Sequence, residues 1–204
     1  MKNGESHYFI ANPALAGDTL TLQPVIFGQN LTFATARGLF SYEKPDAASL
    51  LLMEVMRATQ PPISGTMLDL GCGYGLIGIT LAKTHAAPRL RLTMSDTNEI
   101  ACAYASQNAK KNGVQATVVH CDGFAAIADM FDTITLNPPI HAGKEIMYRL
   151  YKDAAAHLQP KGALYIVIQK KHGAESTINF LHELYPQVGV LHKRKGYYIL
   201  RCTM

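Results

Sequence analysis

The sequence predicts an α/β fold with a doubly wound, mostly parallel seven-stranded sheet, an antiparallel C-terminal hairpin and a short N-terminal β extension. From residue 66 onward, short apolar runs of strand length alternate with segments of helical periodicity, which is typical of βαβ units. The last two strand-like runs, within residues 188–202, stand too close together for a crossover helix. They are therefore expected to pair as an antiparallel hairpin.

The alternation can be followed element by element. The expected strands of the parallel part are residues 66–70, 89–95, 115–121, 131–136 and 162–169. The expected helices are residues 76–85, 98–113, 144–158 and 175–185. The second of these helices ends in two lysines and a glycine, which is a common helix stop, and Pro160 and Gly162 precede the fifth strand.

The first 44 residues have a different pattern. Two segments in which apolar and polar residues alternate flank residues 27–30, which indicates a hairpin turn. Pro45 then opens a helix over residues 45–59, with the acid Asp46 in its first turn. We therefore expect an N-terminal β-hairpin extension, residues 1–44, packed on a core domain, residues 45–204.

The composition limits the class of protein. The chain has 204 residues, of which 48% are hydrophobic and 17% charged, and its net charge is +4. This mildly basic balance permits an acidic partner such as nucleic acid without requiring one. The start has no apolar signal-peptide region, and no run approaches the roughly 18 residues of a membrane span, so a cytoplasmic protein without a membrane partner is expected. The four cysteines form no C-x-x-C pair and show no zinc-ligand spacing, which indicates reduced thiols and no metal.

A glycine-rich loop follows the first strand of the alternating part. Gly73, Gly75 and Gly78 match the G-x-G-x-x-G fingerprint of dinucleotide-binding turns, but this frame leaves two extra residues after the strand. The frame that starts at the strand is D-x-G-x-G-x-G, with Cys72 inside it: Asp69, Gly71, Gly73 and Gly75. The loop therefore fits a nicotinamide site poorly.

Asp69 favours a cationic ligand, because a carboxylate at the end of a buried strand is costly unless paired and would repel a pyrophosphate. S-adenosylmethionine carries an ammonium and a sulfonium group and no phosphate, so the loop and Asp69 indicate this cofactor. In the alternative interpretation, Asp69 is a structural acid bonded to backbone amides of its own loop. The two roles are compatible.

Two further acids follow neighbouring strands. Asp96 can accept both ribose hydroxyls of an adenosyl ligand, or it can cap the helix that begins near Thr97. Asp122, followed by Gly123 and Phe124, can accept from the exocyclic amine of adenine, or it can be a turn residue. The two acids and the residues beside them are all candidate cofactor-binding residues: Asp96, Thr97, Asp122, Gly123 and Phe124.

The stretch Asn137-Pro138-Pro139-Ile140 follows the fourth strand and is the candidate catalytic motif. Its prolines stiffen the loop and hold Asn137 extended. The side-chain oxygen of Asn137 and the carbonyl of Pro138 can then accept the two hydrogens of a flat –NH₂ group and aim its lone pair at a methyl group. Asn137 thus belongs to both the cofactor site and the catalytic site.

In this order of motifs the chain resembles the class I S-adenosylmethionine-dependent methyltransferases, which implies a Rossmann-like fold for residues 45–204. Within that class it resembles the small-subunit ribosomal RNA guanine-N2 methyltransferases and the stand-alone small methyltransferase domains related to them. Further stretches that carry the resemblance, which covers roughly residues 30–201, are 38–41, 137–144, 167–176 and 193–201. It implies methylation of an exocyclic guanine amine in ribosomal RNA, and ribosomal RNA or a ribosomal particle as the partner.

Four residues are candidates for substrate binding: Phe40, His141, Lys170 and Lys171. The two lysines follow the fifth strand and so face the active-site edge, where they can meet phosphate. Solvated surface charge is the alternative. Ile140 stands where adenine and glutamine methyltransferases have an aromatic residue. Adenine N6 and a protein glutamine amide stay open as acceptors, and a non-catalytic binding domain or a nicotinamide oxidoreductase is a remote alternative.

Overall fold

The structure is a computed structural model that describes residues 19–59, 62–84 and 90–204. In this part of the chain, seven strands form one sheet in the order β10-β11-β9-β8-β5-β6-β7. Their bounds are β5 (Thr66–Leu70), β6 (Arg91–Asp96), β7 (Ala116–His120), β8 (Phe131–Leu136), β9 (Leu158–Gln169), β10 (Gln187–Arg194) and β11 (Tyr197–Thr203). Strands β5 to β9 pair in parallel, whereas β11 is antiparallel to both β9 and β10. The predicted fold class is confirmed.

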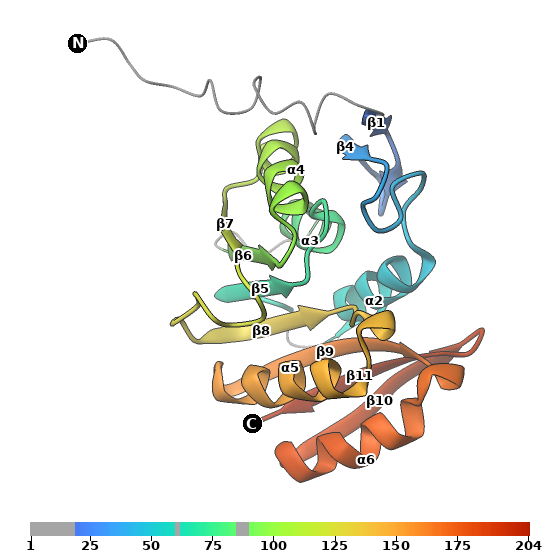
Figure 1. Cartoon of the computed structure of the whole chain (residues 1–204), viewed down its shortest axis with the longest axis vertical. Helices are drawn as coiled ribbons and strands as arrows, with labels where there is room; N and C mark the ends of the chain where they lie inside the picture. Colours follow the sequence, from blue (N-terminus) through green and yellow to red (C-terminus); the bar gives the residue numbers. More distant parts are fainter. Residues whose placement is uncertain (1–18, 60–61, 85–89) are drawn as a thin grey trace.

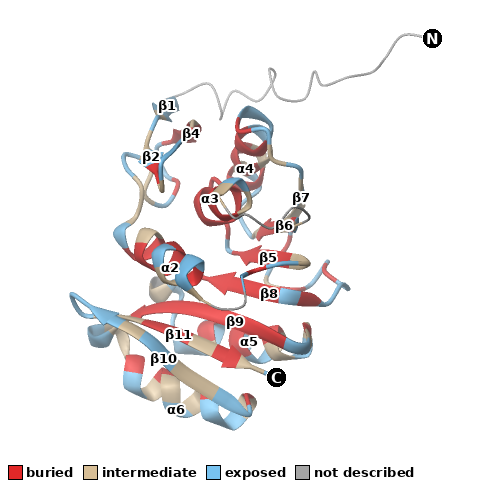
Figure 2. Ribbon diagram, turned by 180° about the vertical axis from the view of Figure 1, so that it is seen from behind, coloured by how far each residue is buried: buried red, intermediate tan, exposed pale blue. Residues whose placement is uncertain are grey.

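Helices cover both faces of this sheet (Figure 1). Their bounds are α2 (Ala47–Ala58), α3 (Leu76–Thr84), α4 (Glu99–Lys111), α5 (Lys144–Ala156) and α6 (Ala174–Leu184). Helices α2, α3 and α4 share one core cluster with Val167 of β9, and α5 and α6 share a second cluster with its neighbour Ile166. Successive side chains of a strand point to opposite faces, so one apolar strand serves both cores. Figure 2 shows the buried residues concentrated along β5, β8 and β9.

The N-terminal extension is held against α4. Strands β1 (Thr19–Leu22) and β4 (Phe33–Ala36) pair antiparallel, and β2 (Val25–Ile26) pairs with β3 (Gln29–Asn30) across the turn that the sequence predicted. The side chain of Asn108 accepts from the Ala34 N–H at 2.7 Å and donates to the Ala34 carbonyl at 2.8 Å. Its amide group therefore makes the hydrogen bonds to β4 that the backbone of a neighbouring strand would otherwise make. Residues 1–18 lie outside the described residues, and the domain division at residue 44 stays a prediction.

Two elements differ from the sequence prediction. Strand β9 begins at Leu158 instead of residue 162, because Leu158 pairs with Phe131 before a bulge, and the ladder resumes at Ala163. Gly162 is needed in this bulge, since a Cβ there would lie 2.8 Å from the carbonyl oxygen of Gln159. Asp46 is the N-cap of α2 and not part of its first turn, because its Oδ2 accepts from the Ser49 N–H at 2.7 Å.

The remaining expectations concern the chain as a whole. In the ranges that the structure describes, no helix combines the length and the apolar character that a membrane span requires. All four cysteines are free and buried. The parallel strands β5 to β9 end at a common edge of the sheet, and the loops that follow them bring together the residues considered next.

Candidate functional site

Two cavities open at the carboxyl edge of the parallel strands. The first, of about 400 Å³, lies over the ends of β5, β6 and β7 and is bordered by α5. The second, of about 380 Å³, lies between the loop before α2, the end of β8 and the ends of β9 and β11. The two cavities share Gly71, Asn137 and Pro139. A narrow recess of about 40 Å³ adjoins them beside Cys72 and Gly73.

The glycine loop presents bare backbone to these cavities. Gly71 has φ +69° and Gly73 has φ +55°, a conformation that strains residues with a side chain. A Cβ added at either glycine would meet no protein atom within 4 Å, so a side chain there would project into open space. The Cys72 N–H donates to the Ser95 carbonyl at 2.9 Å, which ties the loop to β6. Burial raises the pKa of the Cys72 thiol well above its ordinary value, so this thiol stays protonated.

The other two glycines of the pattern serve packing. A Cβ at Gly75 would lie 2.6 Å from the side chain of Ile79, so the absence of a side chain at Gly75 allows close packing against α3, and its contact with the cofactor stays a prediction. A Cβ at Gly78 would lie 3.1 Å from the Asp69 carboxylate. The G-x-G-x-x-G pattern therefore reflects the close approach of α3 to β5.

Asp69 is 1% exposed, and both of its oxygens are bonded within the protein. One oxygen accepts from the Gly78 N–H at 2.8 Å and the other from the Thr135 hydroxyl at 2.9 Å. Burial raises the pKa of Asp69 to about 7, although both hydrogen bonds act to lower it. Asp69 thus has the structural role of the alternative interpretation, in which it joins β5, β8 and α3, and its contact with a cationic ligand stays a prediction.

Asp96 borders the first cavity, next to Ser95 and Thr97. Its carboxylate accepts from the Gly73 N–H at 2.8 Å and from the Asn98 N–H at 2.9 Å. It is not the cap of α4, because Asn98 holds that position and accepts from Ile100 N–H at 3.0 Å. Each carboxylate oxygen has a second lone pair. Asp96 can therefore still accept from two hydroxyl groups in the cavity.

Asp122 and Gly123 also line the first cavity, but Phe124 does not behave as predicted. Asp122 accepts from Arg149 of α5 at 2.7 Å, and this hydrogen bond holds the pKa of its carboxyl below the ordinary value. Phe124 is buried and stacks on His157 with ring centroids 4.3 Å apart, so its side chain belongs to the core. The apolar side chains of Ile146 and Leu150 complete this end of the cavity.

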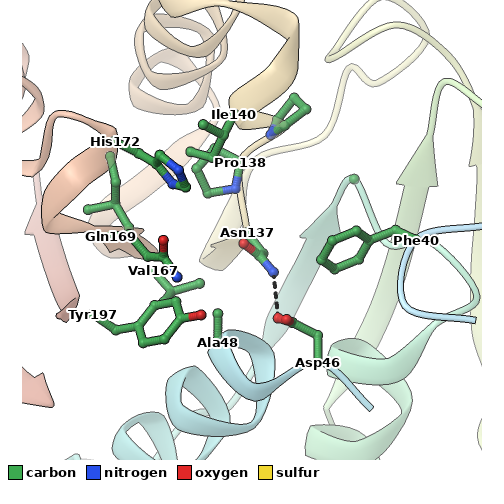
Figure 3. A pocket seen from close by; sticks show the side chains of 13 residues that line it. Phe40, Asp46, Ala48, Asn137, Pro138, Ile140, Val167, Gln169, His172 and Tyr197 are labelled. Carbon is green, nitrogen blue, oxygen red and sulfur yellow. Dashed lines mark hydrogen bonds between the residues drawn. The ribbon is translucent and has the colours of Figure 1, made fainter. Parts of the chain in front are cut away.

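Asn137 is held in one orientation by residues far away in the sequence. Its amide nitrogen donates to Asp46 Oδ2 and to Ser49 Oγ, both at 3.0 Å, across 91 and 88 residues of chain. An amide nitrogen has two hydrogens, and both are used here. Figure 3 shows the amide oxygen on the side away from Asp46. The oxygen of Asn137 is thus left to accept hydrogen bonds from a group in the cavity.

The second cavity combines aromatic, apolar and amide side chains around Asn137 (Figure 3). Phe40 comes from the loop before α2 and is 65% exposed. Tyr197 of β11 and Gln169 of β9 are directly paired across the two strands. Lys170 and Lys171 are exposed in the short 3-10 helix that continues from β9 (Lys170–His172), at the rim beside Gln169 and His172. The side chain of His141 lies outside the described part of the structure.

The described residues fit S-adenosylmethionine, the cofactor that the motif order implies. The backbone of Gly71 and Gly73 faces open space, the Asp96 carboxylate has free lone pairs, and Ile146 and Leu150 form an apolar end. These features suit, respectively, a close approach of ligand to backbone, a ribose and a flat base.

Comparison with known proteins agrees with this geometry. Residues 30–201 match the family model for the methyltransferase small domain. The chain is 37% identical over 198 residues to the uncharacterized protein YbxB of Bacillus subtilis (strain 168), and the match covers 96% of each chain. It is 34% identical over 171 residues to the ribosomal RNA small subunit methyltransferase C of Pasteurella multocida (strain Pm70), covering 80% of this chain and 50% of that protein.

Solved structures give the same result. The T. thermophilus 16S rRNA N2 methyltransferase in complex with AdoMet and guanosine superposes with a TM-score of 0.81 and 27% identity, covering 91% of this chain and 50% of that chain. A methyltransferase from Pyrococcus furiosus, with a TM-score of 0.66 and 19% identity, shares the fold. The chain spans about half the length of the ribosomal RNA methyltransferases that it matches.

Several residues of the site were not among those predicted. Asp46 and Ser49 could have been found from the capping pattern at the start of α2, although nothing local indicates that they reach Asn137. Gln169 is a polar residue at the end of an otherwise apolar strand, which is a weak signal. Tyr197 lies in the stretch 193–201 that carries the resemblance, although nothing there singles it out, and Arg149 has no signal in its own segment.

Proposed function

Since the chain belongs to the methyltransferase small domain family and is an S-adenosylmethionine-dependent methyltransferase, we propose that it methylates the exocyclic amine of a guanine in ribosomal RNA. The observation that carries this proposal is the orientation of Asn137, whose two amide hydrogens bind Asp46 and Ser49. A planar –NH₂ group needs acceptors for both of its hydrogens, and the Asn137 oxygen and the Pro138 carbonyl are suited to this.

Positioning is the main contribution of the protein to this reaction. The bound cofactor supplies an activated methyl group. Asn137 and Pro138 hold the attacking amine so that its lone pair is directed at that methyl, and alignment of bound reactants is worth roughly 7–11 kcal/mol. The same two acceptors stabilise the positive charge that grows on the nitrogen. The methylated amine loses its extra proton to water, so a dedicated general base is unnecessary.

Three features support ribosomal RNA as the acceptor. Two of the proteins reported above, those from Pasteurella multocida and T. thermophilus, are named ribosomal RNA methyltransferases, and the second was solved with guanosine. Phe40 and Tyr197 offer aromatic faces in the cavity, where an unstacked base can bind. Lys170 and Lys171 are exposed at the rim of the same cavity, where a phosphate backbone would pass.

The test is methyl transfer to ribosomal RNA taken from cells that lack the protein, both as naked RNA and as small-subunit particles. After digestion, mass spectrometry should find N2-methylguanosine at one site with wild-type protein and none with Asn137→Ala. N6-methyladenosine as the product would replace guanine by adenine in the proposal. Methylation of a protein glutamine, with no transfer to RNA, would instead place the chain with the glutamine-methylating enzymes.

A further inference from the structure

We infer that Gln169 selects the base: its side-chain oxygen accepts the N1–H of guanine while Asn137 and Pro138 hold the neighbouring amine. This inference rests on the proposed function, because it names the residue that makes the second cavity specific for guanine. The observation behind it is an unpaired polar atom. The Oε1 atom of Gln169 is buried, and in the part of the chain that the structure describes it has no hydrogen-bond partner.

A buried acceptor without a partner is unfavourable by about 1–3 kcal/mol, and folded proteins contain few such atoms. Val167 and Ile168 precede Gln169 on the cavity wall and offer no donor, and the nearby polar side chains of His172 and Tyr197 make no hydrogen bond to its Oε1 atom. Gln169 lines the cavity, so an N–H group of a ligand there would satisfy this oxygen once the end of the side chain turns toward the ligand. A ligand that presents an acceptor at this point would leave it unpaired and add repulsion.

The position of Gln169 relative to Asn137 suits the edge of a purine. Asn137 directly follows β8 and Gln169 ends β9, and these two strands are parallel neighbours, with Leu136 paired to Ile166. Asn137 is therefore level with Val167, and Gln169 lies two residues further along the neighbouring strand, on the same face of the sheet. Both side chains border the same cavity. In Figure 3, Asn137 lies between Phe40 on one side and Gln169 with Tyr197 on the other.

A hydrogen-bond acceptor at this place distinguishes the three groups that the sequence left open as targets of methylation: guanine N2, adenine N6 and a glutamine amide. In guanine, the N2 amine adjoins N1–H, which is a donor. In adenine, the N6 amine adjoins N1, which is an acceptor, and in a glutamine amide the amine adjoins a carbonyl oxygen. Only guanine complements Gln169 Oε1, and the Gln169 amide nitrogen can then donate to the O6 atom of the same base.

The test uses guanosine and 2-aminopurine riboside as probes, each titrated into the protein in the presence of S-adenosylhomocysteine. The second probe has the same N2 amine but has an acceptor at N1 and no O6. Wild-type protein should bind guanosine at least about tenfold more tightly, since one unpaired acceptor is worth about 1–3 kcal/mol. Equal binding, or no measurable binding of either probe, would overturn the inference.

Two variants separate the oxygen of Gln169 from its bulk. Gln169→Leu should lose the preference for guanosine, whereas Gln169→Glu, which can only accept, should keep a preference. Gln115→Leu, an exposed glutamine before β7, is the matched control and should behave as wild type. Unchanged affinity for S-adenosylhomocysteine shows that each variant is folded. A preference that survives in Gln169→Leu, or is lost in Gln169→Glu, would contradict the inference.

Failure here differs from failure of the proposed function. If RNA mapping finds N2-methylguanosine but Gln169→Leu keeps the preference, then guanine is the acceptor and another residue selects it. If mapping finds no methylated guanine, the proposed function itself fails, whichever of the two nucleosides binds more tightly.

Discussion

The two cavities at the carboxyl edge share Gly71, Asn137 and Pro139 but are assembled in different ways. The first is built mainly from loops that directly follow consecutive strands, with α5 as one wall. The second draws on the loop before α2, the helix α2 itself, and the strands β9 and β11, which lie far apart in the sequence. The first cavity therefore depends on local loop conformation, whereas the second depends on how distant elements pack.

This difference teaches where each half of the reaction is controlled. Cofactor binding should respond to changes in single loops, because Gly71, Gly73 and Asp96 act from adjacent strand ends. Acceptor binding and turnover should respond to changes at remote contacts such as Asp46 to Asn137. The following experiments test this division, from the largest expected effect to the smallest.

Asn137→Ala should reduce turnover by roughly 10²–10³, the usual loss when one transition-state hydrogen-bond partner is removed, and should change cofactor affinity by only a few-fold. Steady-state methyl transfer and a cofactor titration measure the two effects. Near-normal turnover would show that Asn137 does not hold the amine, and a large loss of cofactor affinity would show that the two cavities do not function separately.

Asp96→Ala should weaken S-adenosylmethionine binding by about 10- to 100-fold, because hydrogen bonds to a charged group are worth roughly 1.5–3 kcal/mol. Calorimetric titration measures this change, with Asp129→Ala, an exposed acid in the loop before β8, as the control. The second cavity, in which we propose that the guanine binds, should keep its affinity for guanosine. If cofactor affinity is unchanged, Asp96 only orders the loop through Gly73 and Asn98.

Asp46→Ala should lower turnover by about tenfold, since it removes one of the two acceptors that orient Asn137 and leaves only Ser49. It should also cost about 1 kcal/mol of stability as a lost helix cap. Asp46→Asn keeps an oxygen in the same place and should retain most of the turnover. If both variants have the same turnover, the orientation of Asn137 does not depend on this contact.

Asp69→Asn tests the buried acid beneath the loop that both cavities share. The folded-state pKa of Asp69 is raised to about 7 from 3.8, so between these values the folded protein keeps a proton that the unfolded chain loses. The stability of the wild type relative to Asp69→Asn should therefore fall as pH rises from 4 to 7, by about 1.4 kcal/mol per pH unit, and level off above 7. Urea unfolding of both proteins at several pH values measures it. A difference that is independent of pH would show that Asp69 stays ionised.

Lys170→Ala combined with Lys171→Ala should flatten the salt dependence of RNA binding at the rim of the acceptor cavity. Each lost phosphate contact should reduce the slope of log affinity against log salt by about 0.7–0.9, and the methylated nucleotide should stay the same. The adjacent pair Lys110 and Lys111, at the end of α4, gives the matched double-alanine control. An unchanged slope would make Lys170 and Lys171 plain surface charge.

Much of the fold, and several of the residues that line the first cavity, could be predicted because their signals are local. A strand followed by a helix leaves its hydrophobic period in the residues of each segment, and the ends of parallel strands must meet at one edge. The glycines at 71 and 73 and the acids at 96 and 122 adjoin those ends, so their place in the sequence determines their place in the cavity. The Asn137-Pro138-Pro139 stretch was recognisable for the same reason.

Only the tertiary structure decided which way these side chains face. Gly75 and Phe124 come after strands, as the residues that line the cavities do, yet Gly75 packs against Ile79 and Phe124 stacks on His157 in the core. Asp69 is the first residue of the D-x-G-x-G-x-G motif, but α3 packs closely against β5 and encloses its carboxylate.

The same holds for the acceptor side. Asn137 owes its orientation to Asp46, which is 91 residues away, and Gln169 lies beside it because β9 pairs with β8. A hydrogen bond between two side chains requires their atoms to come within about 3 Å. Residues far apart in the sequence reach that distance only once helix and sheet have packed, so no pattern within either segment records the contact.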